Sequence, residues 1–172
     1  LSLMSEFEIE NKVAKSGLIV LEMDDFVADD EIISIDIKDQ LWEGIALKER
    51  DFREYVKTHE WNQYKDKSVA VFCSADAIIP NWAYMLLSTK LEPVASEIYF
   101  DTPKSAEKSR IEKAIENFDV SPYKDSRMII KGCGKKSVHF SAYGKLTEKL
   151  MPVAKTIMFG EPCSTVPVYK KP

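Results

Sequence analysis

The sequence contains only three cysteines, two histidines and six glycines in 172 residues. No apolar run is long enough to cross a bilayer, because Pro80 or a charged residue soon interrupts the longest ones. Basic charge is not in excess, since 24 lysines and arginines stand against 28 aspartates and glutamates, for a net charge of −4. We therefore expect no membrane span and no general attraction to nucleic acid or to acidic membrane surfaces.

Several sequence motifs are also missing. There is no G-x-G-x-x-G or Walker motif, so we expect no nucleotide cofactor. No two cysteines have the C-x-x-C spacing of a zinc ribbon, so a metal site would need thiols that are distant in sequence. No Gly/Ser-rich linker or low-complexity tract divides the chain. We therefore predict a single α/β domain over residues 4–172.

The first residues suggest where the protein resides. Residues 1–3 precede Met4 and look vector-derived, so they are left out of the fold prediction. No charged-then-apolar leader with a small-residue cleavage site opens the chain, and we expect a cytoplasmic protein. Cysteines in that compartment stay reduced and are more often buried, metal-bound or catalytic than disulfide-linked.

The apolar content, 45% of the residues, is sufficient for a core, and its pattern predicts alternating strands and helices. "SVAVF" at 68–72 and "MIIK" at 128–131 are short β-branched or aliphatic runs, as buried parallel strands require. A helix and a further strand follow each run, and another helix joins the two halves. We expect these helices at 81–95, 103–118 and 141–154, and the further strands at 97–101 and 156–159. Four strands alternating with three helices predict a mainly parallel sheet with right-handed crossovers and helices on its faces.

An internal repeat supports this arrangement. "AYMLLSTKLEPVASEIYFDTP" at 83–103 matches "AYGKLTEKLMPVAKTIMFGEP" at 142–162 at 11 of 21 positions, with a constant offset of 59. Shared helix-then-strand patterning alone would not reproduce proline, tyrosine and lysine in register. We interpret the match as a duplicated strand–helix–strand unit, covering residues 68–101 and 127–160.

The first third of the chain has a different pattern. Residues 17–23 and 31–37 look like strands, and residues 49–64 look like a helix that leads into the strand at 68. We expect these strands to extend the same sheet or to pack over one of its edges.

The three cysteines all follow predicted strands. Cys73 ends the first strand of the repeat, Cys133 ends the third, and Cys163 follows the fourth after "GEP". Because the carboxyl ends of parallel strands share one edge of a sheet, where ligands bind, we predict that the three sulfurs converge. Three thiolates could hold zinc or an iron–sulfur cluster, so we expect a metal- or cluster-binding accessory protein. A cysteine at a strand end is also often a small buried hydrophobic residue, so each thiol has a purely structural alternative.

A fourth ligand would come from the same edge. Asp76 lies three residues after Cys73 in one loop, and we include it with the three cysteines as a predicted metal ligand. Its simpler role is a carboxylate at a turn or near a helix start. His139, six residues after Cys133, is a second candidate, although an exposed loop histidine is the simpler interpretation. His59 lies near the end of a helix that feeds the opposite edge.

Two other classes of function remain open on these residues. Cys73 or Cys133 could instead be the nucleophile of a thiol enzyme or the acceptor of a sulfur carrier, although no complete set of nucleophile and base is visible. The protein could also be a binding module that uses the sheet edge for a small ligand or a partner, without metal.

The strings "CSADAIIPNWAYMLLS", "IIKGC", "PVAKTIMFGEPCSTVPVYK" and "DIKDQLWEGIALKERDFREYV" resemble the bacterial family named domain of unknown function 2480. The resemblance covers the chain from about Glu6 onward. It implies no defined activity, but it does imply a bacterial cytoplasmic protein often encoded beside iron–sulfur assembly components, which are then the expected partners. Cys73, Cys133 and Cys163 match the family pattern, whereas His139 falls where that pattern has no histidine.

Overall fold

The computed structural model describes residues 17–132, 134 and 136–172. The chain forms two compact units: unit 1 is Leu1–Ala28 together with Arg110–Pro172, and unit 2 is Asp29–Ser109. Residues 1–3, which we interpret as vector-derived, lie outside the described part. Compact units in one chain are not by themselves separate domains, so the single domain over 4–172 stays a prediction.

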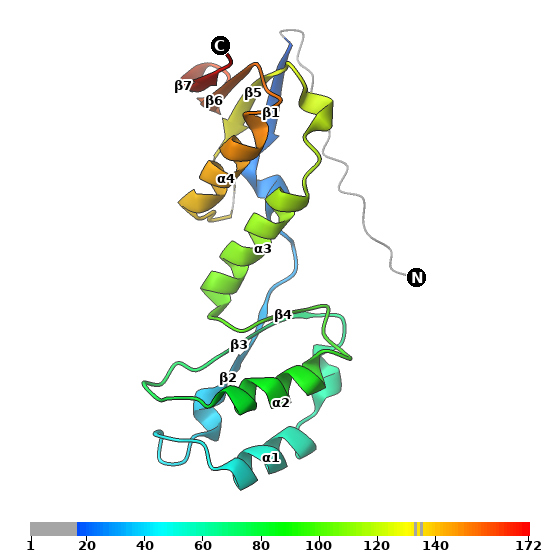
Figure 1. The fold of residues 1–172 in the computed structure, drawn as a ribbon, viewed down its shortest axis with the longest axis vertical. Helices are drawn as coiled ribbons and strands as arrows, with labels where there is room; N and C mark the ends of the chain where they lie inside the picture. Colours follow the sequence, from blue (N-terminus) through cyan, green and yellow to red (C-terminus); the bar gives the residue numbers. More distant parts are fainter. Residues whose placement is uncertain (1–16, 133, 135) are drawn as a thin grey trace. The chain divides into compact units, whose positions relative to one another are not determined.

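Unit 2 is built on a three-stranded parallel sheet with the order β2-β3-β4 (Figure 1). Its strands are β2 (Ile33–Asp36), β3 (Ser68–Phe72) and β4 (Glu97–Tyr99). Its helices are α1 (Glu49–Thr58) and α2 (Asn81–Leu91), with short 3₁₀ turns at Ile37–Gln40 and Trp61–Tyr64. The sequence forms this sheet because β3 is a β-branched run buried at four of its five positions.

The core of unit 2 lies between the sheet and its helices. Val69 and Val71 point from β3 toward Phe52 of α1 and Leu87 of α2, and all four are at most 1% exposed. Phe52 and Val56 are four residues apart, which places both on one face of α1.

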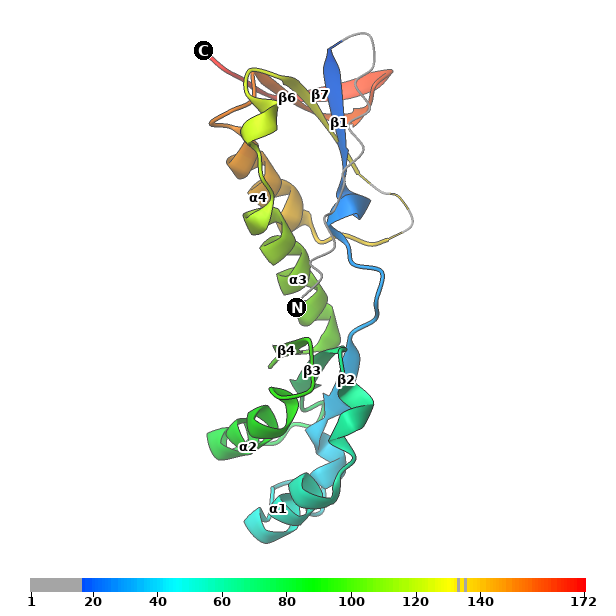
Figure 2. The same cartoon turned by 90° about the vertical axis from the view of Figure 1, so that its right-hand side faces the viewer.

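Unit 1 contains a four-stranded mixed sheet with the order β1-β5-β6-β7 (Figures 1 and 2). Its strands are β1 (Leu18–Glu22), β5 (Arg127–Lys131), β6 (Thr156–Glu161) and β7 (Ser164–Lys170). The first three are parallel, and β7 folds back antiparallel to β6. Helix α4 (Phe140–Leu150) packs against this sheet with the second part of α3 (Pro103–Asn117), whose first part belongs to unit 2. Short 3₁₀ turns lie at Met23–Phe26 and Ser121–Tyr123.

The α/β class is confirmed, and all strand pairs except that of β6 with β7 are parallel, but the prediction of a single sheet is wrong. The parallel pairing of β3 with β4 and of β5 with β6 is as expected. The strands nevertheless divide between two sheets, because β2 pairs with β3 whereas β1 pairs with β5. Each N-terminal strand thus completes a separate parallel set of three. The strand β7 was not expected at all.

The two halves of the predicted repeat have the same order of elements at the same spacing. Adding 59 to the bounds of β3 and α2 gives those of β5 and α4. Asp66 and Asp125, also 59 apart, both have positive φ, at 59° and 57°. Their backbone N–H groups donate to the carbonyls of Val94 and Val153. These features describe arrangement, so an origin by duplication stays a prediction.

Two smaller expectations also differ from the structure. The helices expected to reach 95 and 154 end at Leu91 and Leu150, and the helix expected over 49–64 is divided at His59 into α1 and a 3₁₀ turn. In the described part of the chain, no helix is both long and apolar enough to cross a membrane.

Candidate functional site: the carboxyl edge of the unit 2 sheet

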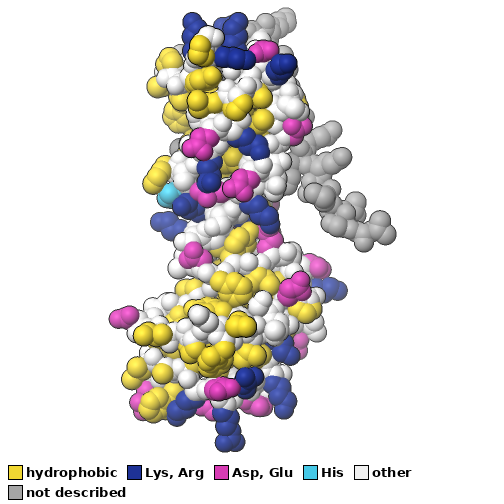
Figure 3. All heavy atoms as spheres, in the orientation of Figure 1, with side chains coloured by type: hydrophobic (Ala, Val, Ile, Leu, Met, Phe, Trp, Pro, Cys, Tyr) yellow, Lys and Arg dark blue, Asp and Glu magenta, His cyan; other side chains and the backbone are white. Residues whose placement is uncertain are grey.

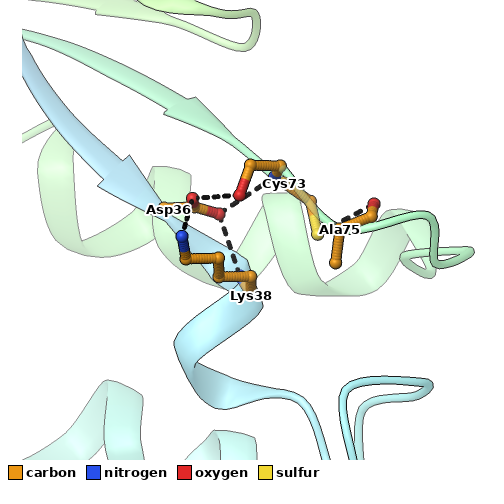
Figure 4. A network of polar contacts seen from close by, with 5 residues as sticks. Asp36, Lys38, Cys73 and Ala75 are labelled. Atoms are coloured by element: carbon orange, nitrogen blue, oxygen red, sulfur yellow. Dashed lines mark hydrogen bonds and ion pairs between the residues drawn. The ribbon is translucent and has the colours of Figure 1, made fainter.

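Cys73 directly follows β3, the central strand of the unit 2 sheet, and opens the segment 73–80 that leads to α2. Its side chain is half-buried and packs against the unit 2 core. The sulfur lies 3.7 Å from the carbonyl oxygen of Ala75, to which it donates a weak hydrogen bond (Figure 4). The thiol is therefore placed at the edge of a parallel sheet where ligands commonly bind.

Asp36 fixes the start of the same loop. It ends β2, and its carboxylate accepts hydrogen bonds from the backbone N–H of Ser74 at 3.0 Å and from the Ser74 hydroxyl at 2.6 Å. The N–H of Lys38 donates to it at 3.0 Å, and the Lys38 ammonium lies 3.6 Å away (Figure 4). One carboxylate thus joins the carboxyl ends of two neighbouring strands beside Cys73.

Two pKa values at this edge are shifted. Partial burial alone would raise the pKa of Asp36, but the hydrogen bonds from Ser74 and Lys38 and the charge of Lys38 outweigh it, so the pKa is lowered. Asp36 is therefore ionised at neutral pH. Burial, followed by the nearby Cys73, raises the pKa of Tyr84 on α2. The Tyr84 ring makes an edge contact with Phe100, with ring centroids 6.0 Å apart.

Asp76 is exposed in the loop that begins at Cys73. Across residues 17–132, 134 and 136–172, no three His, Cys, Asp or Glu side chains are grouped so that they could hold a metal ion. The described surroundings of Cys73 and Asp76 thus do not amount to a metal centre.

Of the other two cysteines, Cys163 belongs to unit 1. Glu161 pairs with Ser164 across the β6–β7 hairpin, so Pro162 and Cys163 form its two-residue loop, where Cys163 is exposed. Cys133 lies outside the described residues. A site shared at one sheet edge requires a single sheet, whereas the strands form two sheets. The three-thiol centre itself stays a prediction.

Cys73 has no thiol counterpart at the matching position of unit 1. Adding 59 to its number gives Gly132, whereas Cys133 corresponds to Ser74. A Cβ atom at Gly132 would lie 3.0 Å from the Phe159 ring and 3.1 Å from the Tyr143 hydroxyl. The aromatic pair therefore occupies the space that a side chain at position 132 would need.

The two histidines have structural roles. His139 caps α4: its Nδ1 atom accepts from the Ser141 backbone N–H at 3.2 Å and lies 2.8 Å from the Ser141 hydroxyl. His59 lies among Tyr55, Trp61 and Tyr64, with its Nε2 atom 2.9 Å from the Tyr64 hydroxyl. Burial lowers the pKa of His59, which favours its neutral form.

Sequence reasoning missed Asp36, Ser74 and Tyr84 as neighbours of the thiol. A usable signal exists: Asp36 ends one apolar strand and Ser74 follows the end of another. The signal becomes meaningful only once β2 and β3 are known to be adjacent, which local pattern does not establish.

Taken together, the two sheets and the Cys73 edge define an α/β protein with a half-buried thiol at the end of a parallel strand. The model of the family described as protein of unknown function (DUF2480) matches residues 7–171, so the chain belongs to that family. Comparisons with curated proteins and with solved structures found no match. Function must therefore be argued from the site.

Proposed function

We propose that this protein is cytoplasmic and that the thiol of Cys73 is its reactive group, as a sulfur acceptor or a nucleophile. The observation that carries the proposal is the position of Cys73: half-buried, at the carboxyl end of a central parallel strand, in a loop held by Asp36 and Ser74. A reactive group needs a fixed position, and Asp36 holds the loop of Cys73 through Ser74.

The transfer that this site supports is simple and balanced. The Cys73 thiolate attacks the outer sulfur of a donor persulfide, R–S–SH, and the donor S–S bond breaks. The donor leaves as its thiol, R–SH, and Cys73 becomes a persulfide. A second thiol can remove the outer sulfur by the same exchange. Iron–sulfur assembly proteins are the partners that would use such a carrier.

A metal-binding accessory protein is the competing proposal. Cys73, Cys133, Cys163 and Asp76 would then hold zinc or an iron–sulfur cluster, as we expect from the sequence. The expectation of a shared site rested on one sheet edge, and the strands form two sheets, so we favour the single-thiol site.

One preparation distinguishes the two proposals. The protein is purified without oxygen, and its metal content and visible spectrum are measured. It is then treated with a small persulfide, its cysteines are alkylated, and the modified residues are located by mass spectrometry. We expect a colourless protein without stoichiometric metal, in which Cys73 accepts sulfur from a small persulfide such as glutathione persulfide. Cys73→Ser should abolish the added mass at this site, whereas the matched variant Cys163→Ser should retain it. Stoichiometric metal that is lost in both variants would instead establish the three-thiol centre.

We also propose that the two strand–helix–strand units arose by duplication. The shared offset of 59 between the bounds of their elements supports this origin.

A further inference from the structure

The sheet of unit 1 has two faces with different surroundings. The core residues that pack with α3 and α4 are Ile19, Leu21, Met128, Ile130 and Ile157, which are alternate positions of β1, β5 and β6. Side chains alternate along a strand, so the residues between them point to the other face. Ile129 is one of these, and it is fully buried without belonging to the helix-packed core.

Strand register places charged and apolar residues in two rows on this second face. Arg127 pairs with Thr156, and Thr156 pairs with Lys170, so the three side chains lie side by side across β5, β6 and β7. Two residues further along, Met158 pairs with Ile129 on one side and with Pro167 on the other. A basic row therefore runs beside an apolar row.

The two rows enclose a shallow hollow of about 320 Å³, lined by Arg127, Thr156, Met158, Pro167, Val168 and Lys170, with Tyr169 beside them. Its volume is at the lower end of the range for small-molecule sites. Figure 3 shows the side of unit 1 on which α4 lies, so the face with the hollow points away from the viewer there.

The cations of this hollow are available to a ligand. Within the described residues, neither Arg127 nor Lys170 has a carboxylate in ion-pair contact, whereas Lys131 contacts Glu22 and Glu161. The Thr156 hydroxyl is buried and, in the same part of the chain, has no hydrogen-bond partner.

We propose that this hollow binds a small anionic amphiphile: an organic carboxylate with an apolar chain. Arg127 and Lys170 hold the carboxylate, since charge-assisted hydrogen bonds are the stronger ones. Met158, Pro167 and Val168 cover the apolar chain. A second copy of this chain fits less well, because a two-fold contact through this face would bring the two basic rows together. The proposal is independent of Cys73.

The test uses octanoate as the probe and the full chain at neutral pH. Calorimetric titration should detect saturable binding, and NMR shift changes should be confined to β5, β6 and β7. Arg127→Gln combined with Lys170→Gln should weaken binding by about tenfold or more, because both partners of the carboxylate are lost. The matched control, Lys57→Gln combined with Lys65→Gln in unit 2, makes the same charge change and should leave affinity unchanged.

Three results would overturn the proposal: no saturable binding of octanoate, equal binding of octanol and octanoate, or unchanged affinity in the Arg127 and Lys170 variant. Should that variant fail to fold, Met158→Glu provides a second test, since a carboxylate on the floor of the hollow should repel the ligand. Retained octanoate affinity in a folded Met158→Glu protein would also count against the site.

Discussion

Asp36 is the residue on which the geometry of the thiol loop depends. Its carboxylate satisfies two donors of Ser74 and one of Lys38, so its removal leaves the loop next to Cys73 without its tie to β2. Asp36 holds the loop in place and does not take part in thiol chemistry, since it contacts Ser74 and not the sulfur of Cys73.

We predict that Asp36→Asn lowers the free energy of unfolding by about 1–2 kcal/mol at neutral pH, because hydrogen bonds to a charged acceptor are lost. The pKa of Asp36 is lowered in the folded protein, so its stabilisation is present above the ordinary carboxyl pKa and disappears as pH falls through the folded-state value. The stability difference between wild type and variant should therefore shrink below about pH 4.

Urea denaturation at neutral and acidic pH measures this difference. The control is Asp76→Asn in the same loop, which is exposed and should change stability by less than about 0.5 kcal/mol. A difference between wild type and Asp36→Asn that stays constant with pH would show that the carboxylate charge does not matter.

Helix α4 contains an unusual residue for its interior, Gly144. A Cβ atom there would meet nothing within 4 Å, so alanine fits without strain. Gly144 also borders an apolar hollow of about 350 Å³ between α4 and the strands, lined by Phe140, Tyr143 and Phe159 among others. In α2, the residue 59 positions earlier is Met85, which is 68% exposed.

We predict that Gly144→Ala raises the free energy of unfolding by up to about 1 kcal/mol, because alanine has the higher helix propensity. Thermal or urea unfolding monitored by circular dichroism measures the change. Gly132→Ala is the informative contrast: its Cβ would be 3.0 Å from the Phe159 ring, so the aromatic pair must shift and stability should fall. If both substitutions changed the free energy of unfolding equally, the space at Gly144 would not be free or the space at Gly132 would not be occupied.

Most elements could be predicted from local sequence, and the exceptions have physical reasons. "SVAVF" and "MIIK" identify strands because at least three consecutive residues of each are buried, so apolar residues occupy both alternating sides of the strand. "STVPVYK" does not look like a strand, because Pro167 interrupts it; proline is tolerated there because β7 is an edge strand. Without β7, the placement of Cys163 in a tight hairpin loop could not be foreseen.

At the scale of the whole molecule, the chain has two separate cores. The core cluster of unit 1 and that of unit 2 have no residue in common. Leu146 and Leu87 occupy matching places in the two, 59 residues apart, and neither is exposed. The pair allows the same substitution to be made once in each core.

We predict that Leu87→Ala and Leu146→Ala each cost about 2–5 kcal/mol, but in different places. Amide hydrogen exchange should accelerate in β2, β3 and β4 for Leu87→Ala, and in β1, β5 and β6 for Leu146→Ala. Native-state exchange followed by mass spectrometry resolves the two patterns. Accelerated exchange throughout both sheets in either variant would mean that the units open together.

The division into two sheets could not be predicted, because it depends on pairing between distant segments. Each strand–helix–strand half is local and its parallel pairing follows from the crossover. The partner of Leu18 is Arg127, which is more than a hundred residues away, and no local pattern selects β5 over β3 for β1. The predicted convergence of the three thiols rested on one continuous sheet edge. The pairing of distant strands into two sheets removes that basis.

The interruption of unit 1 by unit 2 has a consequence for synthesis on the ribosome. β1 is translated early, but its hydrogen-bonding neighbour β5 emerges only after all of Asp29–Ser109 has been made. Unit 2 is contiguous and can fold as it leaves the exit tunnel. The nascent "LIVLE" segment, however, remains without its β5 partner during this time, so its backbone groups are unpaired and its apolar side chains are exposed. We therefore expect a chaperone to bind this segment during synthesis.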